Sequence, residues 1–256
     1  MTIRKTFARL KSAREMALIA YETAGFPSLH DSISNIRLLA DSGADIIELG
    51  IPFSDPIADG PTIQVSSQVA LENGVSFIQI LEAVSRVDPE TPLVAMSYLN
   101  PLLSYGKGRL FKDMKSAGFS GMIIPDLPLE EAGDWKRMAQ EAGIDLIFLV
   151  TPTTSKERLK GLVEASEGFI YCVSLTGITG TRTALPPHLS EFLVSVKSLT
   201  DKPAAVGFGI STPEHVRQLK GIADGVIIGS RIVKAMENGE DVGKLVRGLK
   251  DACIGS

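Results

Sequence analysis

The stretch Asp45-Ile46-Ile47-Glu48-Leu49 is almost continuously apolar, and it is one of eight short runs of this kind along the 256-residue chain. Runs rich in Ile, Val, Leu and Phe are typical of strands that are buried on both faces of a parallel sheet. The other seven runs are Ala17–Tyr21, Leu93–Ser97, Gly121–Ile124, Asp145–Val150, Phe169–Val173, Ala204–Gly207 and Gly225–Ile228. The sequence therefore contains eight candidate parallel strands.

The segments between these runs have the spacing of amphipathic helices. Ile33, Ile36 and Leu39 share one helical face before Gly43, a residue at which a helix can end. Strand–helix alternation repeated eight times in about 250 residues predicts an α/β fold, a single (β/α)8 TIM barrel over residues 1–256. A doubly wound open sheet is the alternative, but it usually has fewer strands and a glycine-rich loop after the first one. Here the first strand is followed by Glu22-Thr23-Ala24-Gly25-Phe26-Pro27.

We expect extra helices at two places in this barrel. Basic residues, among them Arg4, Lys5 and Arg9, gather near the N-terminus. They indicate a first helix with a solvated basic face better than they indicate a transit peptide. The long gap between the second and third strands leaves room for an extra helix, at about Thr62–Asn73, before the usual one at Ser76–Val87.

The composition excludes several classes of function. The formal net charge is −4 and no Lys/Arg cluster is present, so we expect no nucleic-acid partner. No apolar run approaches the roughly 18 residues of a membrane span. Two isolated cysteines, Cys172 and Cys253, make no disulfide framework and fit a reducing cytoplasm. The histidines His30, His188 and His215 stand far apart, so we expect surface or loop positions for them and no metal site.

The active site of such a barrel forms at the C-terminal ends of its strands, where Glu48 lies. A carboxylate in an apolar strand is costly unless it is paired or used. The alternative is a structural Glu held by an internal Arg or Lys, and the strand alone does not decide between the two.

The loop 51–61 that follows contains three prolines, one glycine and two aspartates. Such a shaped loop could hold Asp55 or Asp59 over the barrel mouth, although Asp55 could instead cap a helix in a surface turn.

Glycines follow the seventh and eighth strands, in Phe208-Gly209 and Gly229-Ser230. Glycines let the main chain approach an anion, and the loops after these two strands often bind phosphate in such barrels. A third glycine-rich segment, Gly177–Arg182, could cover that phosphate as a lid or be an ordinary loop.

No Lys lies in or at the end of a candidate strand, which disfavours a Schiff-base aldolase. The reaction class that remains is proton transfer by carboxylates on a substrate that is anchored through its phosphate.

At these residues the sequence resembles the tryptophan synthase alpha chain family, and the resemblance covers nearly the whole chain. The most specific part is Glu48–Gln64, which reads ELGIPFSDPIADGPTIQ. Three further stretches agree with the family in order and spacing, namely Ser174–Gly180, Gly207–Ser211 and Gly229-Ser230.

The resemblance implies a lyase of tryptophan biosynthesis that cleaves indole-3-glycerol phosphate reversibly to indole and glyceraldehyde 3-phosphate. It assigns to Glu48 both the protonation of indole C3 and the removal of the proton from the side-chain hydroxyl. It makes Asp59 the acceptor for the indole N–H. It also implies that several residues line the substrate pocket, namely Tyr21, Met96, Tyr98, Ile123, Tyr171 and Thr179. The residues that match the family's phosphate contacts are Gly180, Phe208, Gly209, Gly229 and Ser230.

The family's alpha chain works with a beta chain that carries pyridoxal phosphate. The resemblance therefore implies an alpha2–beta2 heterotetramer and no organic cofactor in this chain, with Pro52 and Asp55 placed to contact the partner. Three alternatives stay open at this point. They are another phosphate-binding barrel such as an isomerase or epimerase, a stand-alone lyase that releases indole without a beta chain, and a non-catalytic module that only activates a beta chain.

Overall fold

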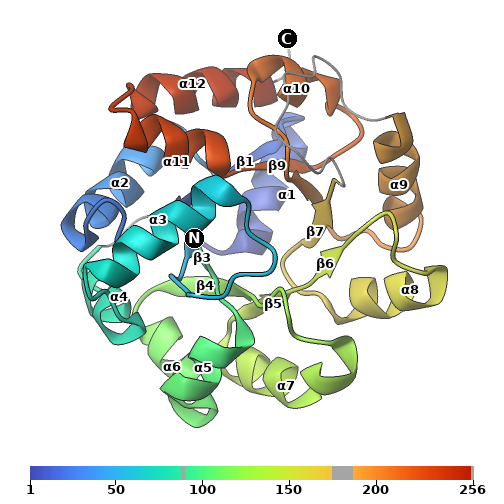
Figure 1. The fold of residues 1–256 in the computed structure, drawn as a ribbon. Helices are drawn as coiled ribbons and strands as arrows, with labels where there is room; N and C mark the ends of the chain where they lie inside the picture. Colours follow the sequence, from blue (N-terminus) through green and yellow to red (C-terminus); the bar gives the residue numbers. More distant parts are fainter. Residues whose placement is uncertain (88–89, 175–186, 255–256) are drawn as a thin grey trace.

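The computed structural model describes residues 1–87, 90–174 and 187–254 and has a ring of helices around a parallel barrel (Figure 1). The strands pair in the order β5-β4-β3-β2-β1-β9-β8-β7-β6. They are β1 (Ala17–Thr23), β2 (Ile46–Gly50), β3 (Leu93–Met96), β4 (Phe119–Ile123), β5 (Asp145–Ile147), β6 (Leu149–Val150), β7 (Ile170–Val173), β8 (Ala204–Gly207) and β9 (Gly225–Ile228). The predicted TIM barrel is confirmed.

The described helices alternate with these strands as the sequence predicts. They are α1 (Ile3–Ala13), α2 (Leu29–Asp41), α3 (Pro61–Glu72), α4 (Phe77–Val84), α5 (Leu99–Tyr105), α6 (Lys107–Ser116), α7 (Ala132–Ala142), α8 (Lys156–Ala165), α9 (Pro187–Lys197), α10 (Pro213–Gln218), α11 (Ser230–Glu237) and α12 (Val242–Cys253). Both expected extra helices are present, as α1 and α3.

The predicted fifth strand is divided at Phe148 into β5 and β6. β5 pairs with β4, and β6 pairs with β7, so this one segment joins the two ends of the strand order. The Phe148 N–H leaves the ladder and donates to Ser166 Oγ at 3.0 Å. The Phe148 carbonyl accepts from the Tyr171 N–H at 3.1 Å. The division therefore bends the strand without leaving its main-chain polar groups unpaired.

Alternate residues of each strand face different sides of the barrel wall. In β1, Ala17, Ile19 and Tyr21 belong to the cluster inside the barrel, whereas Leu18 and Ala20 belong to the cluster beneath the surrounding helices. This two-residue period follows from strand geometry. It places alternate positions of the eight strands in one inner core.

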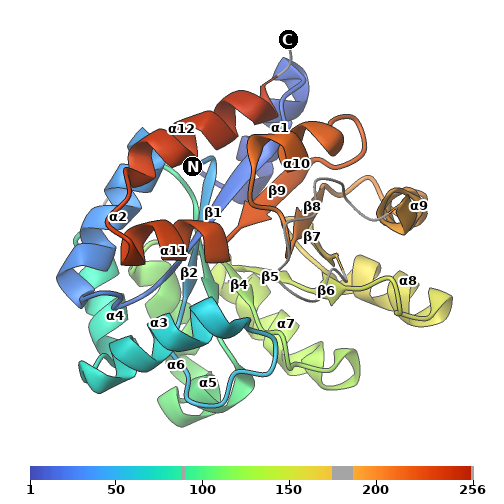
Figure 2. The ribbon, with the colours of Figure 1, turned by 45° about the horizontal axis from the view of Figure 1, so that its top comes forward.

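The N-terminal helix α1 closes one end of the barrel. Its residues Ile3, Phe7 and Leu10 are buried and belong to the inner cluster, and the Phe7 and Phe169 rings lie 5.8 Å apart. In Figures 1 and 2, α1 lies behind the strands and α3 in front of them. The active-site end is therefore the end that α3 and the loop before it border.

One expectation about the histidines is wrong. His30 has an exposed side chain and His188 is exposed, but His215 is only 9% exposed. His215 is the third residue of α10, which packs against α12. Hydrophilic residues in short helices can thus be covered by a neighbouring element that a local pattern does not reveal.

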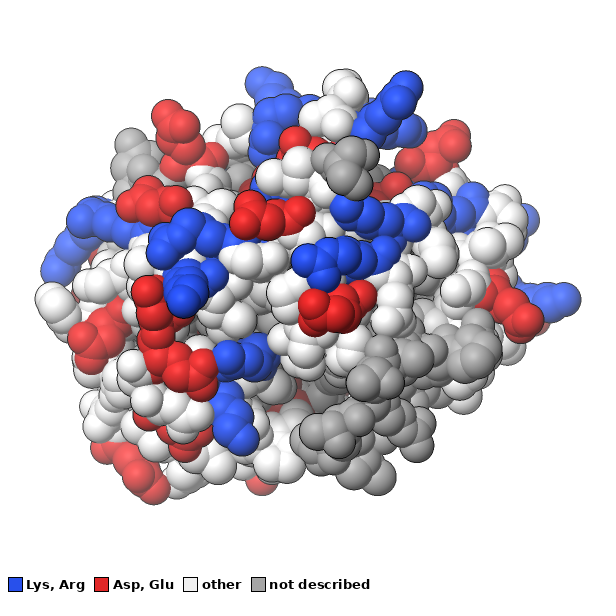
Figure 3. Space-filling model, turned by 90° about the horizontal axis from the view of Figure 1, so that it is seen from above, with Lys and Arg blue, Asp and Glu red and all other residues white. Residues whose placement is uncertain are grey.

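Three observations describe the surface charges, the helix lengths and the metal-ligating side chains. On the face seen in Figure 3, described Lys and Arg side chains are interspersed with Asp and Glu and form no continuous basic patch. Within the described ranges, no helix is long and apolar enough to cross a membrane. The same residues include no group of three or more His, Cys, Asp or Glu side chains placed to hold a metal ion.

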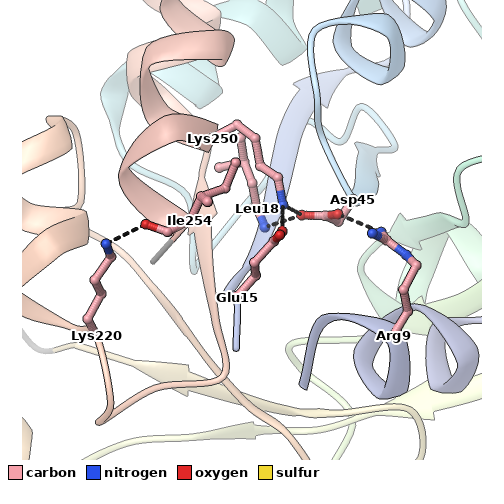
Figure 4. Close-up of polar contacts among 7 residues, drawn as sticks. All are labelled: Arg9, Glu15, Leu18, Asp45, Lys220, Lys250 and Ile254. Carbon is pink, nitrogen blue, oxygen red and sulfur yellow. Dashed lines mark hydrogen bonds and ion pairs between the residues drawn. The ribbon is translucent and has the colours of Figure 1, made fainter. Parts of the chain in front are cut away.

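Asp45 connects three parts of the chain just before β2 begins (Figure 4). Its carboxylate accepts hydrogen bonds from the Leu18 N–H at 3.0 Å, from Arg9 at 2.9 Å and from Lys250 at 2.9 Å. Lys250 also donates to Glu15 at 3.0 Å. Burial lowers the pKa of Lys250, but the bonds to Asp45 and Glu15 outweigh it and raise that pKa overall. The cluster therefore fixes α1, β1 and α12 to one another.

We expect Asp45→Ala to destabilise the fold by about 3 kcal/mol, because it removes the acceptor of the Leu18 N–H and of Arg9 and leaves Lys250 with Glu15 alone. Urea unfolding of the variant and the parent measures the difference. Glu141→Ala is the control, since it removes the exposed ion pair of Glu141 with Arg137 at 2.9 Å and such a pair contributes at most about 1 kcal/mol. Equal losses in the two variants would contradict the anchoring role of Asp45.

Candidate active site

Glu48 lies inside the barrel at the C-terminal end of β2. It is fully buried, and among the described residues neither of its carboxyl oxygens has a hydrogen-bond partner. Burial, with a smaller contribution from the charge of Asp59, raises the pKa of Glu48 to about 8. The alternative of a structural Glu held by an internal Arg or Lys is therefore wrong among the described residues. An unpaired buried carboxyl group with a raised pKa is suited to give and take protons near neutral pH.

Two tyrosines border Glu48 inside the barrel. Tyr21 is its register partner on β1, and Tyr171 lies on β7. Both phenols are buried, and burial raises the pKa of each well above 10. A Cβ atom at Gly50 would lie 2.1 Å from the Tyr21 hydroxyl oxygen, and one at Gly207 would lie 2.6 Å from that of Tyr171. The two glycines thus provide the space that the phenol groups occupy.

Asp59 approaches Glu48 from the loop between β2 and α3. Burial raises the pKa of Asp59, while a hydrogen bond from the Tyr98 hydroxyl lowers it. The Ala58 N–H donates to the same hydroxyl at 3.0 Å, and Gln64 Nε2 donates to the Asp59 carbonyl at 2.7 Å. The loop is therefore held at both sides of Asp59.

The turns after β8 and β9 expose main-chain N–H groups. Within the described chain, the N–H groups of Gly209 and Ser230 donate to no main-chain carbonyl. Phe208, with φ of 69°, adopts a left-handed conformation that costs a non-glycine residue on the order of 1 kcal/mol, and Gly209 follows with φ of 80°. Ser174 Oγ holds this turn by donating to the carbonyls of Gly207 and Phe208. The turn and the start of α11 thus offer free donors to an anion.

The structure brings most of the candidate site residues together. Tyr21, Met96, Ile123 and Tyr171 belong to one inner cluster, and Phe208 packs against it. The rings of Tyr171 and Phe208 have centroids 6.2 Å apart, which joins the pocket to the candidate phosphate turn. The two remaining candidates, Thr179 and Gly180, lie outside the described residues.

A pair of buried hydroxyl groups beside Tyr21 was not predicted from the sequence. Thr23 Oγ1 and Ser66 Oγ lie 2.6 Å apart and are buried, and the Tyr21 hydroxyl is 3.4 Å from Thr23 Oγ1. The pair links the end of β1 to α3, the helix that follows the Asp59 loop. Forty-three positions separate the two residues, so no local pattern could have revealed the contact.

Comparison with known proteins agrees with this geometry. Residues 7–253 match the family described as tryptophan synthase alpha chain. The chain belongs to that family. A tryptophan synthase alpha chain of Geobacter sulfurreducens is 44% identical over 255 residues, which cover 96% of this chain and 97% of that protein. One of Arabidopsis thaliana is 46% identical over 239 residues, covering 92% of this chain and 87% of that protein.

Solved structures show the same fold. A chain of Mycobacterium tuberculosis tryptophan synthase has a TM-score of 0.93 at 36% identity, covering 99% of this chain and 98% of that one. The tryptophan synthase alpha chain of Legionella pneumophila subsp. pneumophila has a TM-score of 0.89 at 37% identity, covering 100% of this chain and 99% of that one. The family consists of lyases of tryptophan biosynthesis that cleave indole-3-glycerol phosphate, and this chain is such a lyase.

The burial of Glu48 makes stability depend on pH. Because its folded pKa of about 8 exceeds the ordinary value of 4.5, its contribution to stability is fully present below pH 4.5 and is lost as the pH rises through 8. We therefore expect Glu48→Gln to gain stability relative to the parent over this range, by at most about 1.4 kcal/mol per pH unit. Urea unfolding at pH 5, 7 and 8.5 measures the gain. A difference between the two proteins that does not change with pH would overturn the assignment.

Proposed function

We propose that Glu48 is the acid and base of indole-3-glycerol phosphate cleavage. Its carboxyl group gives a proton to indole C3, and the resulting carboxylate takes the proton of the hydroxyl on the adjacent side-chain carbon. The bond between these carbons then breaks, its electron pair returns to the ring, and indole and glyceraldehyde 3-phosphate leave. Glu48 ends in its starting protonation state. The observation that carries this proposal is a fully buried carboxyl group with no hydrogen-bond partner at the strand end.

Asp59 supplies the opposite charge in this proposal. Protonation of indole C3 places positive charge on the ring nitrogen, and a carboxylate that accepts the N–H stabilises that charge. The electrostatic effect of Asp59 on Glu48 and on both buried phenols supports its position at the pocket. Its contribution grows as the charge develops, so it acts on kcat more than on KM.

The substrate phosphate binds, in this proposal, at the turn after β8 and at the start of α11. The N–H groups of Gly209 and Ser230 that lack main-chain acceptors support this assignment, together with the positive end of the helix dipole. Tyr21, Met96, Tyr98, Ile123 and Tyr171 then surround the indole ring. Thr179, Gly180 and Gly229 complete the pocket and the phosphate contacts that the family resemblance implies.

The partner of the chain is a tryptophan synthase beta chain, which family membership implies. We further propose an alpha2–beta2 complex in the cytoplasm, with pyridoxal phosphate bound by the beta chain alone. Pro52 and Asp55 are placed to contact that partner. Two observations support these assignments. The Asp55 side chain bonds only to the neighbouring Ser54 within the described residues, and both cysteines are free thiols.

Turnover measurements on four proteins test the catalytic roles. We expect Glu48→Gln to lower kcat for indole release by about 10²–10⁴-fold or more, which is the usual contribution of a general acid–base group. Asp59→Asn should lower kcat strongly with a smaller change in KM. Glu72→Gln is the control, because Glu72 is on α3 and bonds only to Gln68. A folded Glu48→Gln protein with near-parental kcat would refute the mechanism.

Crystals grown with sulfate or phosphate test the anion site. We expect one anion within about 2.7–3.2 Å of the Gly209 and Ser230 nitrogen atoms. In Gly229→Ala, the new Cβ would lie 3.2 Å from Tyr21 Cδ1, so Tyr21 or the start of α11 must move by a few tenths of an ångström. KM for indole-3-glycerol phosphate should then rise more than kcat falls. An anion bound only elsewhere, or an unchanged KM, would count against this phosphate site.

A further inference from the structure

Tyr98 follows β3 and reaches the loop that carries Asp59. Its hydroxyl accepts from the Ala58 N–H at 3.0 Å. An interaction with the same hydroxyl lowers the pKa of the Asp59 carboxyl group, against the larger effect of burial. Its ring packs on Phe53 of the same loop, with centroids 5.4 Å apart and planes inclined by 33°. One buried side chain therefore contacts the loop at three successive places, one of them the proposed charge-stabilising group.

We propose that Tyr98 is a positioning residue that holds the Asp59 carboxylate at the pocket mouth before the substrate arrives. The inference rests on the proposed function of Asp59. One carboxylate oxygen accepts the Tyr98 hydroxyl, which leaves the other oxygen to accept the indole N–H. The hydroxyl accepts from the Ala58 N–H and keeps its own proton, which in this proposal is donated to Asp59.

The contact between Tyr98 and Asp59 also affects which of two neighbouring carboxyl groups, Asp59 or Glu48, is protonated. Asp59 faces Glu48 on β2, Tyr21 on β1, Tyr171 on β7 and Tyr98, and the charge of Asp126 acts on Tyr98 in turn. In the described residues, no Lys or Arg contributes to the shifted pKa of Glu48 or Asp59. Burial raises the pKa of both carboxyl groups, that of Glu48 to about 8, and the interaction with Tyr98 acts in the opposite direction on Asp59, so it favours the ionised form there. The reaction needs this arrangement, an acid next to an anion.

The chain contains a matched control for this arrangement at Tyr105. The Tyr105 hydroxyl donates to Asp113 at 2.6 Å, and its ring meets Phe77 with centroids 5.0 Å apart. Tyr105 thus has an aromatic neighbour and a carboxylate acceptor, as Tyr98 has, but it belongs to α5 outside the pocket. Tyr105→Phe and Tyr98→Phe remove the same hydroxyl group from comparable surroundings.

Steady-state kinetics of Tyr98→Phe test the role through the substrate. We expect kcat for indole release to fall about 10- to 100-fold with little change in KM, because a hydrogen bond to a charged group contributes on this scale. The acid limb of the kcat–pH profile should move to higher pH, since loss of the bond raises the pKa of Asp59. Tyr105→Phe should retain parental kinetics.

In an Asp59→Asn background, Tyr98→Phe should change kcat by less than about twofold. A KM-only effect, or an undiminished loss in that background, overturns the proposal.

Amide hydrogen exchange tests the anchor without substrate. We expect the Ala58 N–H to exchange several-fold faster in Tyr98→Phe, while the Ile51 N–H, which donates to the Met96 carbonyl at 2.8 Å, keeps its parental rate. Unchanged exchange at Ala58 overturns the anchoring role. If the parent protein does not cleave indole-3-glycerol phosphate, the proposed function fails, and this exchange measurement still decides whether Tyr98 fixes the loop.

Discussion

The site depends on a carboxyl group that is buried inside the barrel without a cation. Apolar side chains and the phenols of Tyr21 and Tyr171 form the inner core of the barrel, and among the described residues no hydrogen bond reaches the Glu48 oxygens. A charge in such a place is costly, so the group favours its protonated form. An ion pair at this position would remove that cost and would favour the ionised form. The proposed role of Glu48 as an acid therefore fits the lack of a cationic partner among the described residues.

Two carboxyl groups within four positions of the chain segment around strand β2, those of Asp45 and Glu48, have opposite surroundings. Asp45, just before the strand, accepts hydrogen bonds from Leu18, Arg9 and Lys250. Glu48, near its C-terminal end, accepts none. The first group connects helices to the barrel, whereas the second is free to exchange protons. This division agrees with the general rule that these barrels separate stability and chemistry between their two ends.

The eight apolar runs, the extra helix after β2 and the location of Glu48 could be predicted from the sequence, because each rests on a local pattern. The division of the fifth strand at Phe148 could not, since it depends on a hydroxyl group from Ser166. The burial of His215 could not be predicted either, because the packing of α10 against α12 is not visible in a local pattern. The contact of Tyr98 with the Asp59 loop joins residues 40 positions apart. Local periodicity therefore determines which elements form, while long-range polar contacts determine how the catalytic groups are oriented.

Tyr21 joins the Glu48 end of the site to the end at which we propose that the phosphate binds. Its hydroxyl fills the space left by Gly50 at the end of β2, and its ring lies against Gly229 at the start of α11. A shift of the phosphate helix would therefore press on the same side chain that packs beside Glu48. Packed interiors transmit such shifts because they hold few voids. Groups held in this way stabilise a developing charge without having to reorganise during the reaction.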